Sequence, residues 1–204
     1  MISETILNIF SSVWPMLLIF ITIIISMRIT YLIDHKGEPY YLYKDLMVLG
    51  FVIYILCLFH VVTFQDVSWS TSNFIPFKEM LRYDFGTMMF YKNVLGNMIM
   101  FIPFGFFTSY FLTIKDKYKI FILSIITSIT IETTQLMIGR VFDVDDILLN
   151  VFGGLIGYLV YRFLDGIKER LPKFLQKTIV YNIIMFLVLI LIFAYLYMII
   201  YWGI

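Results

Sequence analysis

Residues 120–164 read IFILSIITSITIETTQLMIGRVFDVDDILLNVFGGLIGYLVYRFL, two long apolar runs on either side of a short polar connection. The runs 120–138 and 147–164 each approach the roughly 20 apolar residues that a helix needs to cross a hydrocarbon layer of about 30 Å. Inside a lipid layer a single segment has to satisfy its own backbone hydrogen bonds, which a helix does. The stretch therefore predicts a pair of antiparallel membrane-spanning helices.

The rest of the chain repeats this pattern. Four further apolar runs lie at 5–27, 46–64, 89–113 and 179–202. Of the 204 residues, 61% are apolar and 14% charged, whereas soluble domains average about 45–50% apolar and about 25% charged. We predict an all-α, polytopic transmembrane bundle of about six helices in the cell membrane, forming one domain over residues 1–204, with membrane lipids as its surroundings.

The basic residues predict the orientation of this bundle. Eleven of the 15 Lys and Arg residues lie in the connections after the first, third and fifth spans. Because cytoplasmic loops carry an excess of these residues, we expect those connections inside the cell and both termini outside. The net charge of +1 gives no reason to expect nucleic acid as a partner.

The connection between the second and third spans carries its own pattern. In STSNFIPFKEMLRYDF, Pro76 suits the first turn of a short helix. Phe77, Met80, Leu81 and Phe85 then share one face, which favours an interfacial helix at the outer surface. The alternative is a loop whose aromatic side chains pack on the bundle.

Polar side chains recur in the halves of three spans that this orientation puts near the extracellular surface. Asn93 and Asn97 are four residues apart and Glu132 and Gln135 three apart, so each pair is expected on one helix face. The connection after Glu132 and the loop before the third span add further polar groups. The candidate ligand-binding residues are Asn73, Asn93, Asn97, Glu132, Gln135, Arg140, Asp143, Asp145, Asp146 and Asn150.

Several of these residues also have a purely structural interpretation. Asp145 or Asp146 is expected to cap the fifth span, because a carboxylate satisfies N–H groups at a helix start. The asparagines can bond between helices, and Arg140 with Asp143 can form an ion pair of little energetic consequence. Glu132 is different, because an acid well inside a span costs about 2.5–3.5 kcal/mol and must face the bundle. We therefore favour a functional role for Glu132.

Two further features bear on packing and chemistry. Gly153 and Gly157 form a small-xxx-small pattern, which predicts close approach of a neighbouring helix. His35 and His60 lack zinc-site spacing. Glu132, Asp143, Asp145 and Asp146 could offer oxygens to Mg²⁺ or Ca²⁺, a weak signal because it rests on ligand type alone. No phosphate-binding glycine loop or serine nucleophile motif is present in the sequence. We predict no metal and no cofactor.

The motifs NFIPF at 73–77, NVLGNMIMFIPFGF at 93–106, IETTQLMIGRVFDVDDILLN at 131–150 and GGLIGYLVY at 153–161 together resemble the VanZ-like membrane proteins. The resemblance covers about residues 40–165 and leaves out the sixth span. It implies a role in resistance to teicoplanin-type glycopeptides. The characteristic positions of the family fall on Asn73, Pro76, Phe77, Asn93, Asn97, Pro103, Phe104, Gly105, Glu132, Gln135, Arg140, Asp143, Asp145, Asp146, Asn150, Gly153 and Gly157.

Three functions are compatible with this pattern. The first is a non-enzymatic envelope protein that binds a lipophilic glycopeptide, a teichoic-acid-type polymer or a lipid-linked wall precursor in a pocket open to the outer leaflet. The second is an enzyme acting on an envelope lipid or a polyprenyl-phosphate-linked precursor, with Glu132 as general base and Asp145 and Asp146 as further catalytic residues. The third is a lipid transporter, for which the cytoplasmic halves of the spans offer few polar groups. We rank them in this order.

Overall fold

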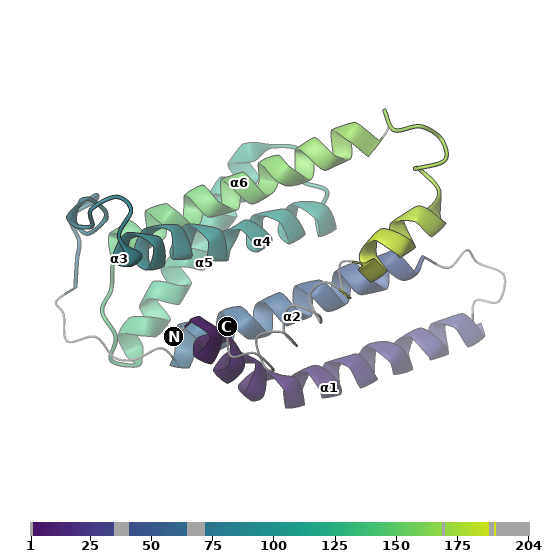
Figure 1. Cartoon of the computed structure of the whole chain (residues 1–204), viewed down its shortest axis with the longest axis horizontal. Coiled ribbons are helices and arrows are strands. Elements are labelled where there is room, and N and C mark those ends of the chain that lie inside the picture. The colour runs from purple at the N-terminus through teal and green to yellow at the C-terminus, as the bar shows by residue number, and fades with distance from the viewer. Residues whose placement is uncertain (1, 35–40, 65–71, 169, 188–189, 191–204) are drawn as a thin grey trace. The chain divides into compact units, whose positions relative to one another are not determined.

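Helices account for most of the described chain in a computed structural model, which describes residues 2–34, 41–64, 72–168, 170–187 and 190 (Figure 1). The described part contains no strand, in agreement with the predicted all-α class. The named elements are α1 (Ile2–Asp34), α2 (Leu42–Phe64), η1 (Met80–Arg82), α3 (Met88–Phe90), η2 (Tyr91–Leu95), α4 (Gly96–Phe111), α5 (Lys117–Met137) and α6 (Val144–Lys168).

Five described helical segments are long and apolar enough to cross a membrane: Val13–Asp34, Leu42–Thr63, Met88–Phe111, Lys117–Met137 and Val144–Lys168. They correspond to the first five predicted spans. For the sixth, an apolar helix is described over Thr178–Leu187, and most of the remaining predicted range lies outside the described residues. The chain is thus a helical, multi-spanning membrane protein.

The third span is one continuous helix with an irregular turn. Thr87 caps its start by accepting the N–H of Phe90 at 3.2 Å. Its second turn, η2, is a π-helix, in which hydrogen bonds run from i to i+5 and the turn is one residue wider. Farther along, Pro103 lies inside α4 and has no N–H to donate to the preceding turn.

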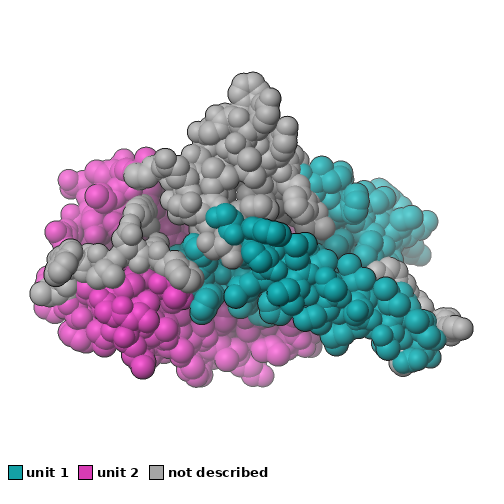
Figure 2. Space-filling view, turned by 90° about the horizontal axis from the view of Figure 1, so that it is seen from below, with its two compact units in different colours: residues 1–61, 169–204 teal, residues 62–168 magenta. Residues whose placement is uncertain are grey.

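Contacts between residues divide the chain into two units, residues 1–61 with 169–204 and residues 62–168 (Figure 2). In the first unit, Arg28 of α1 pairs with Asp45 of α2 at 2.9 Å. The N–H of Tyr43 donates to Asn182 Oδ1 at 2.9 Å, which joins α2 to the helix Thr178–Leu187. Nothing tests the prediction of a single domain, which stays a prediction.

In the second unit, α6 packs against both α4 and α5 (Figure 1). Glycines make these contacts close: a Cβ on Gly157 would lie 2.0 Å from the carbonyl oxygen of Ile102, and one on Gly153 would lie 2.0 Å from that of Met98. On α4, a Cβ on Gly105 would lie 1.9 Å from the carbonyl oxygen of Gly154. The predicted close approach at Gly153 and Gly157 is confirmed, and the neighbouring helix is α4.

The loop between the second and third spans contains less helix than its pattern predicts. The predicted short helix is one turn of 3₁₀ helix, η1, and the backbone of Phe77 ahead of it has a left-handed φ of 66°. The left-handed conformation stops a regular helix from starting at Pro76. Phe77, Leu81 and Phe85 are exposed in the described structure, and the Phe85 ring lies edge-on to that of Phe90 at the start of the third span, with ring centroids 5.2 Å apart.

Candidate functional site

The loop before the third span is joined to the start of α6 by a short stretch of backbone pairing. Asn73 forms a parallel bridge with Asp143, in which its N–H donates to the Phe142 carbonyl at 2.9 Å and its own carbonyl accepts from Val144 at 3.1 Å. The Asn73 side chain adds a bond from Nδ2 to Asp143 Oδ1 at 2.9 Å. Residues about 70 apart in sequence are therefore held side by side.

Asp145 holds the rest of this loop. Its carboxylate accepts the backbone N–H groups of Phe77 at 2.5 Å, Glu79 at 2.8 Å and Met80 at 3.0 Å. The side chain is only 1% exposed. Buried backbone N–H groups need acceptors, and a carboxylate that receives several of them forms strong, charge-assisted bonds. Asp145 thus fixes the path of the loop.

The predicted cap of α6 is supplied by a different residue. Asp143 directly precedes α6, and its Oδ1 accepts the N–H of Asp145 at 2.9 Å, which is the bond an N-cap side chain makes. Asp145 and Asp146, one of which was predicted to cap this helix, lie in its first turn and accept hydrogen bonds from the loop and from Asn97. Burial raises the pKa of Asp143, and the bonds from the Asp145 N–H and the Asn73 amide oppose that rise.

Glu132 lies at the centre of a second set of bonds. It is 2% exposed, as expected for an acid that faces the bundle, and its Oε2 accepts the N–H of Asp143 at 3.1 Å. The amide orientation that satisfies the neighbours of Gln135 has its nitrogen donating to Glu132 Oε1 at 3.1 Å and its oxygen accepting from Arg140 at 2.7 Å. Arg140 also donates to the Val62 carbonyl at 3.0 Å.

A left-handed residue at the end of α5 explains how Arg140 reaches these groups. Gly139 has a φ of 85°, a conformation that costs glycine little and lets a helix end abruptly. The N–H of Arg140 then folds back to the Gln135 carbonyl at 2.9 Å. Arg140 is thereby returned toward the last turns of α5, beside Gln135.

The first turns of α6 carry two further contacts to neighbouring helices. Asn97 of α4 donates to the carboxylate of Asp146. One turn farther along α6, the fully buried Asn150 donates to Ser128 Oγ of α5 at 2.9 Å. Asp146 and Asn150 therefore face the neighbouring helices α4 and α5, respectively.

Nine of the ten predicted residues thus take part in one contiguous region, which we call the polar cluster: Asn73, Asn97, Glu132, Gln135, Arg140, Asp143, Asp145, Asp146 and Asn150. Asn93 differs, because its amide donates to the Met89 carbonyl of its own helix at 3.0 Å. The prediction also missed Ser128, which lies four residues before Glu132 on the same face of α5, and Ser72, whose hydroxyl accepts the N–H of Phe142 at 3.3 Å.

Electrostatics of the polar cluster are dominated by acids. Asp146 interacts through charge with Glu132, Asp143 and Arg140. Many of the hydrogen bonds that these carboxylates accept therefore come from amides and backbone N–H groups rather than from cations. No three His, Cys, Asp or Glu side chains among the described residues converge as metal ligands.

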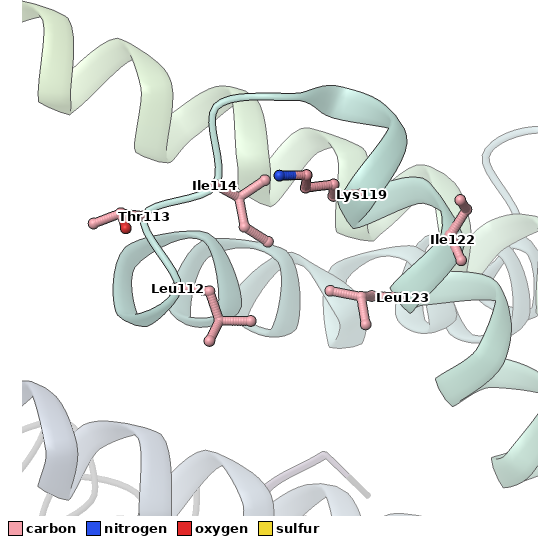
Figure 3. A pocket seen from close by; sticks show the side chains of 6 residues that line it. All are labelled: Leu112, Thr113, Ile114, Lys119, Ile122 and Leu123. Atoms are coloured by element: carbon pink, nitrogen blue, oxygen red, sulfur yellow. The ribbon is translucent and has the colours of Figure 1, made fainter.

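A hollow of about 370 Å³ lies at the opposite end of α5. It is lined by Leu112, Thr113, Ile114, Lys119, Ile122 and Leu123, at the connection between α4 and α5 (Figure 3). Glu132 is 13 residues beyond Lys119 on α5, which corresponds to about 20 Å along a helix. This hollow is thus separate from the polar cluster.

Long apolar helices and an interior of carboxylates and amides at one end of α5 and α6 define a polytopic membrane protein with a buried polar site. The chain belongs to the VanZ/LLP1 family, whose model matches residues 51–165. That range agrees with the resemblance found in the motifs and contains the whole polar cluster. No significant match was found to a curated protein or to a solved structure.

Proposed function

We propose that this protein lowers the susceptibility of the cell to teicoplanin-type lipoglycopeptides by binding a lipid-linked or lipophilic envelope ligand at the polar cluster. The single observation that carries the proposal is the linked arrangement of Glu132, Gln135 and Arg140. An acid, an amide and a guanidinium in one chain of bonds match ligands that carry phosphate or carboxylate together with hydroxyl or amide groups.

The burial of each residue suggests whether it contacts the ligand or positions another side chain. Asn97, Arg140 and Asp146 are half-buried and are assigned to contact the polar part of the ligand. Glu132 and Gln135 are buried and are assigned to position Arg140.

Two substitutions test this function. Glu132→Gln removes the carboxylate that accepts a hydrogen bond from the Gln135 amide. Arg140→Ala removes the cation that would pair with an anionic ligand. In cells that depend on this protein for protection, each variant is expected to return the minimal inhibitory concentration of teicoplanin to that of cells lacking the protein, at unchanged protein level. Vancomycin, a glycopeptide without an acyl chain, is expected to show a smaller change.

Arg162→Ala is the matched control, because Arg162 lies on α6 in an exposed pair with Asp165 at 3.8 Å. It should leave the inhibitory concentration unchanged. Full protection by both cluster variants at normal protein level would refute the proposed site.

The orientation is a second part of the proposal, supported by the distribution of basic residues. In a Cys57→Ala background, Ile138→Cys, in the connection between α5 and α6, should react with a membrane-impermeant maleimide on intact cells, whereas Lys115→Cys should react only after the membrane is opened. Both positions are exposed in the described structure. Labelling in the reverse pattern would put the polar cluster on the cytoplasmic side and remove the route to an extracellular drug.

A further inference from the structure

The loop between the second and third spans presents an unusual surface. Within residues 74–85, which we call the apolar loop, Phe85 is 86% exposed and Leu81 83% exposed. Phe74, Ile75 and Phe77 are also more than half exposed. Large apolar groups that gather on one exposed segment mark a surface that contacts lipid or another molecule.

This exposure occurs on a backbone that is held in place. Three N–H groups of the apolar loop donate to the buried carboxylate of Asp145. Ile75 donates to Asn73 Oδ1 at 3.1 Å, and Asn73 is itself bridged to Asp143. The apolar side chains therefore point outward from a backbone that is tied to the buried start of α6.

The two ends of the apolar loop define its depth. It begins next to Asn73, which pairs with the residues at the start of α6. It ends shortly before Met88, the first residue of the third span. Because both attachments are at the ends of membrane-spanning helices, the two ends of the loop are held close to the boundary of the hydrocarbon layer.

We propose that the apolar loop inserts its side chains into the interfacial region of the lipid bilayer, on the same side as the polar cluster. The occupant of this surface is thus lipid, because the surface continues the exposed apolar face of the third span at Met88 and Met89. Its two basic residues, Lys78 and Arg82, are balanced by Glu79 and Asp84. Insertion is therefore driven by apolar contact and does not require anionic lipid.

Fluorescent labels at single cysteines test this inference in the full chain. In a Cys57→Ala background, an environment-sensitive fluorophore is attached at Leu81→Cys or Phe85→Cys and the protein is placed in bilayer nanodiscs. One set of nanodiscs contains phosphatidylcholine alone and the other contains phosphatidylcholine with phosphatidylglycerol. Lys115→Cys, at an exposed polar position between α4 and α5, is the aqueous control, and Ile126→Cys, on the exposed apolar face of α5, is the control for the bilayer interior.

Labels at Leu81 and Phe85 are expected to be quenched by iodide about threefold less than the label at Lys115, because interfacial burial excludes the ion. A nitroxide near the lipid headgroup should quench them more than one near the chain end, and the label at Ile126 should show the reverse order. The result should be the same in both lipid mixtures.

Two results would overturn the inference. Quenching by iodide as strong as at Lys115 would mean that the loop stands in water. Protection from both iodide and lipid nitroxides would mean that protein covers it, either a second copy of the chain or another partner. Neither result bears on the drug-susceptibility test, so failure of this inference is distinguishable from failure of the proposed function.

Discussion

Gly157→Ala is expected to lower the free energy of unfolding by about 3 kcal/mol or more, because it forces a methyl group into an already filled contact. Its Cβ would lie 2.0 Å from the Ile102 carbonyl oxygen and 2.7 Å from the Phe106 nitrogen, both of them backbone atoms of α4. Backbone in a helix cannot rotate away as a side chain can, so α4 and α6 have to separate. Unfolding in detergent with a denaturant, followed by circular dichroism, measures the change.

Gly166→Ala is the control for this substitution. Gly166 lies on the same helix, its φ is not left-handed, and nothing lies within 4 Å of its Cβ position. Alanine forms helices better than glycine by about 1 kcal/mol in a helix interior, so this variant should be as stable as the native protein or slightly more stable. Equal stability of the Gly157→Ala and Gly166→Ala variants would mean that α4 and α6 do not pack as described.

Asp145→Asn is the second substitution with a large expected effect. It is expected to lower the free energy of unfolding by about 3 kcal/mol. The carboxylate accepts from the N–H groups of Phe77, Glu79 and Met80 with both of its oxygens. An amide has one oxygen, and its NH₂ group would face a backbone N–H that also donates. At least one of these part-buried N–H groups is left without its acceptor, and the loop is expected to leave its place on α6.

Amide hydrogen exchange reports this change directly. In the variant, the N–H groups of Phe77, Glu79 and Met80 should exchange faster, while those in the middle of α5 keep their protection. Asp165→Asn provides the comparison, because Asp165 is exposed on α6 and should change stability by no more than about 0.5 kcal/mol. Unaltered exchange at all three loop positions in Asp145→Asn would contradict the assigned role of Asp145.

The membrane spans were predictable because hydrocarbon imposes a length and a composition that can be counted along the chain. The prediction that the Glu132 side chain faces the interior of the bundle had the same basis, since a carboxylate in contact with lipid tails is costly. Gly153 and Gly157 likewise carried enough information to predict a close helix contact. The identity of the partner helix, α4, depends on the packing of the whole unit and is not written in the spacing.

Other features depended on local geometry that a regular period does not describe. Asn93 and Asn97 were both expected at the site, but the Asn93 amide, in the π-helical turn η2, donates to the Met89 carbonyl one turn earlier in the same span. Asp143 caps α6 in place of Asp145 or Asp146. The carboxylate of Asp145 instead accepts from the loop backbone, and that of Asp146 accepts from Asn97. The partners of Asp145 and Asp146 lie up to 68 residues away in sequence, where periodicity gives no information.

The distance along the chain between the apolar loop and its acceptor has a consequence for biogenesis. Phe77 leaves the ribosome 68 residues before Asp145 does. Until Asp145 has been synthesised, the loop amides have no carboxylate to receive them. The surface that carries the apolar loop is therefore completed late in synthesis, and a nascent chain that stops before residue 145 still carries an aromatic-rich segment that is not yet held by Asp145.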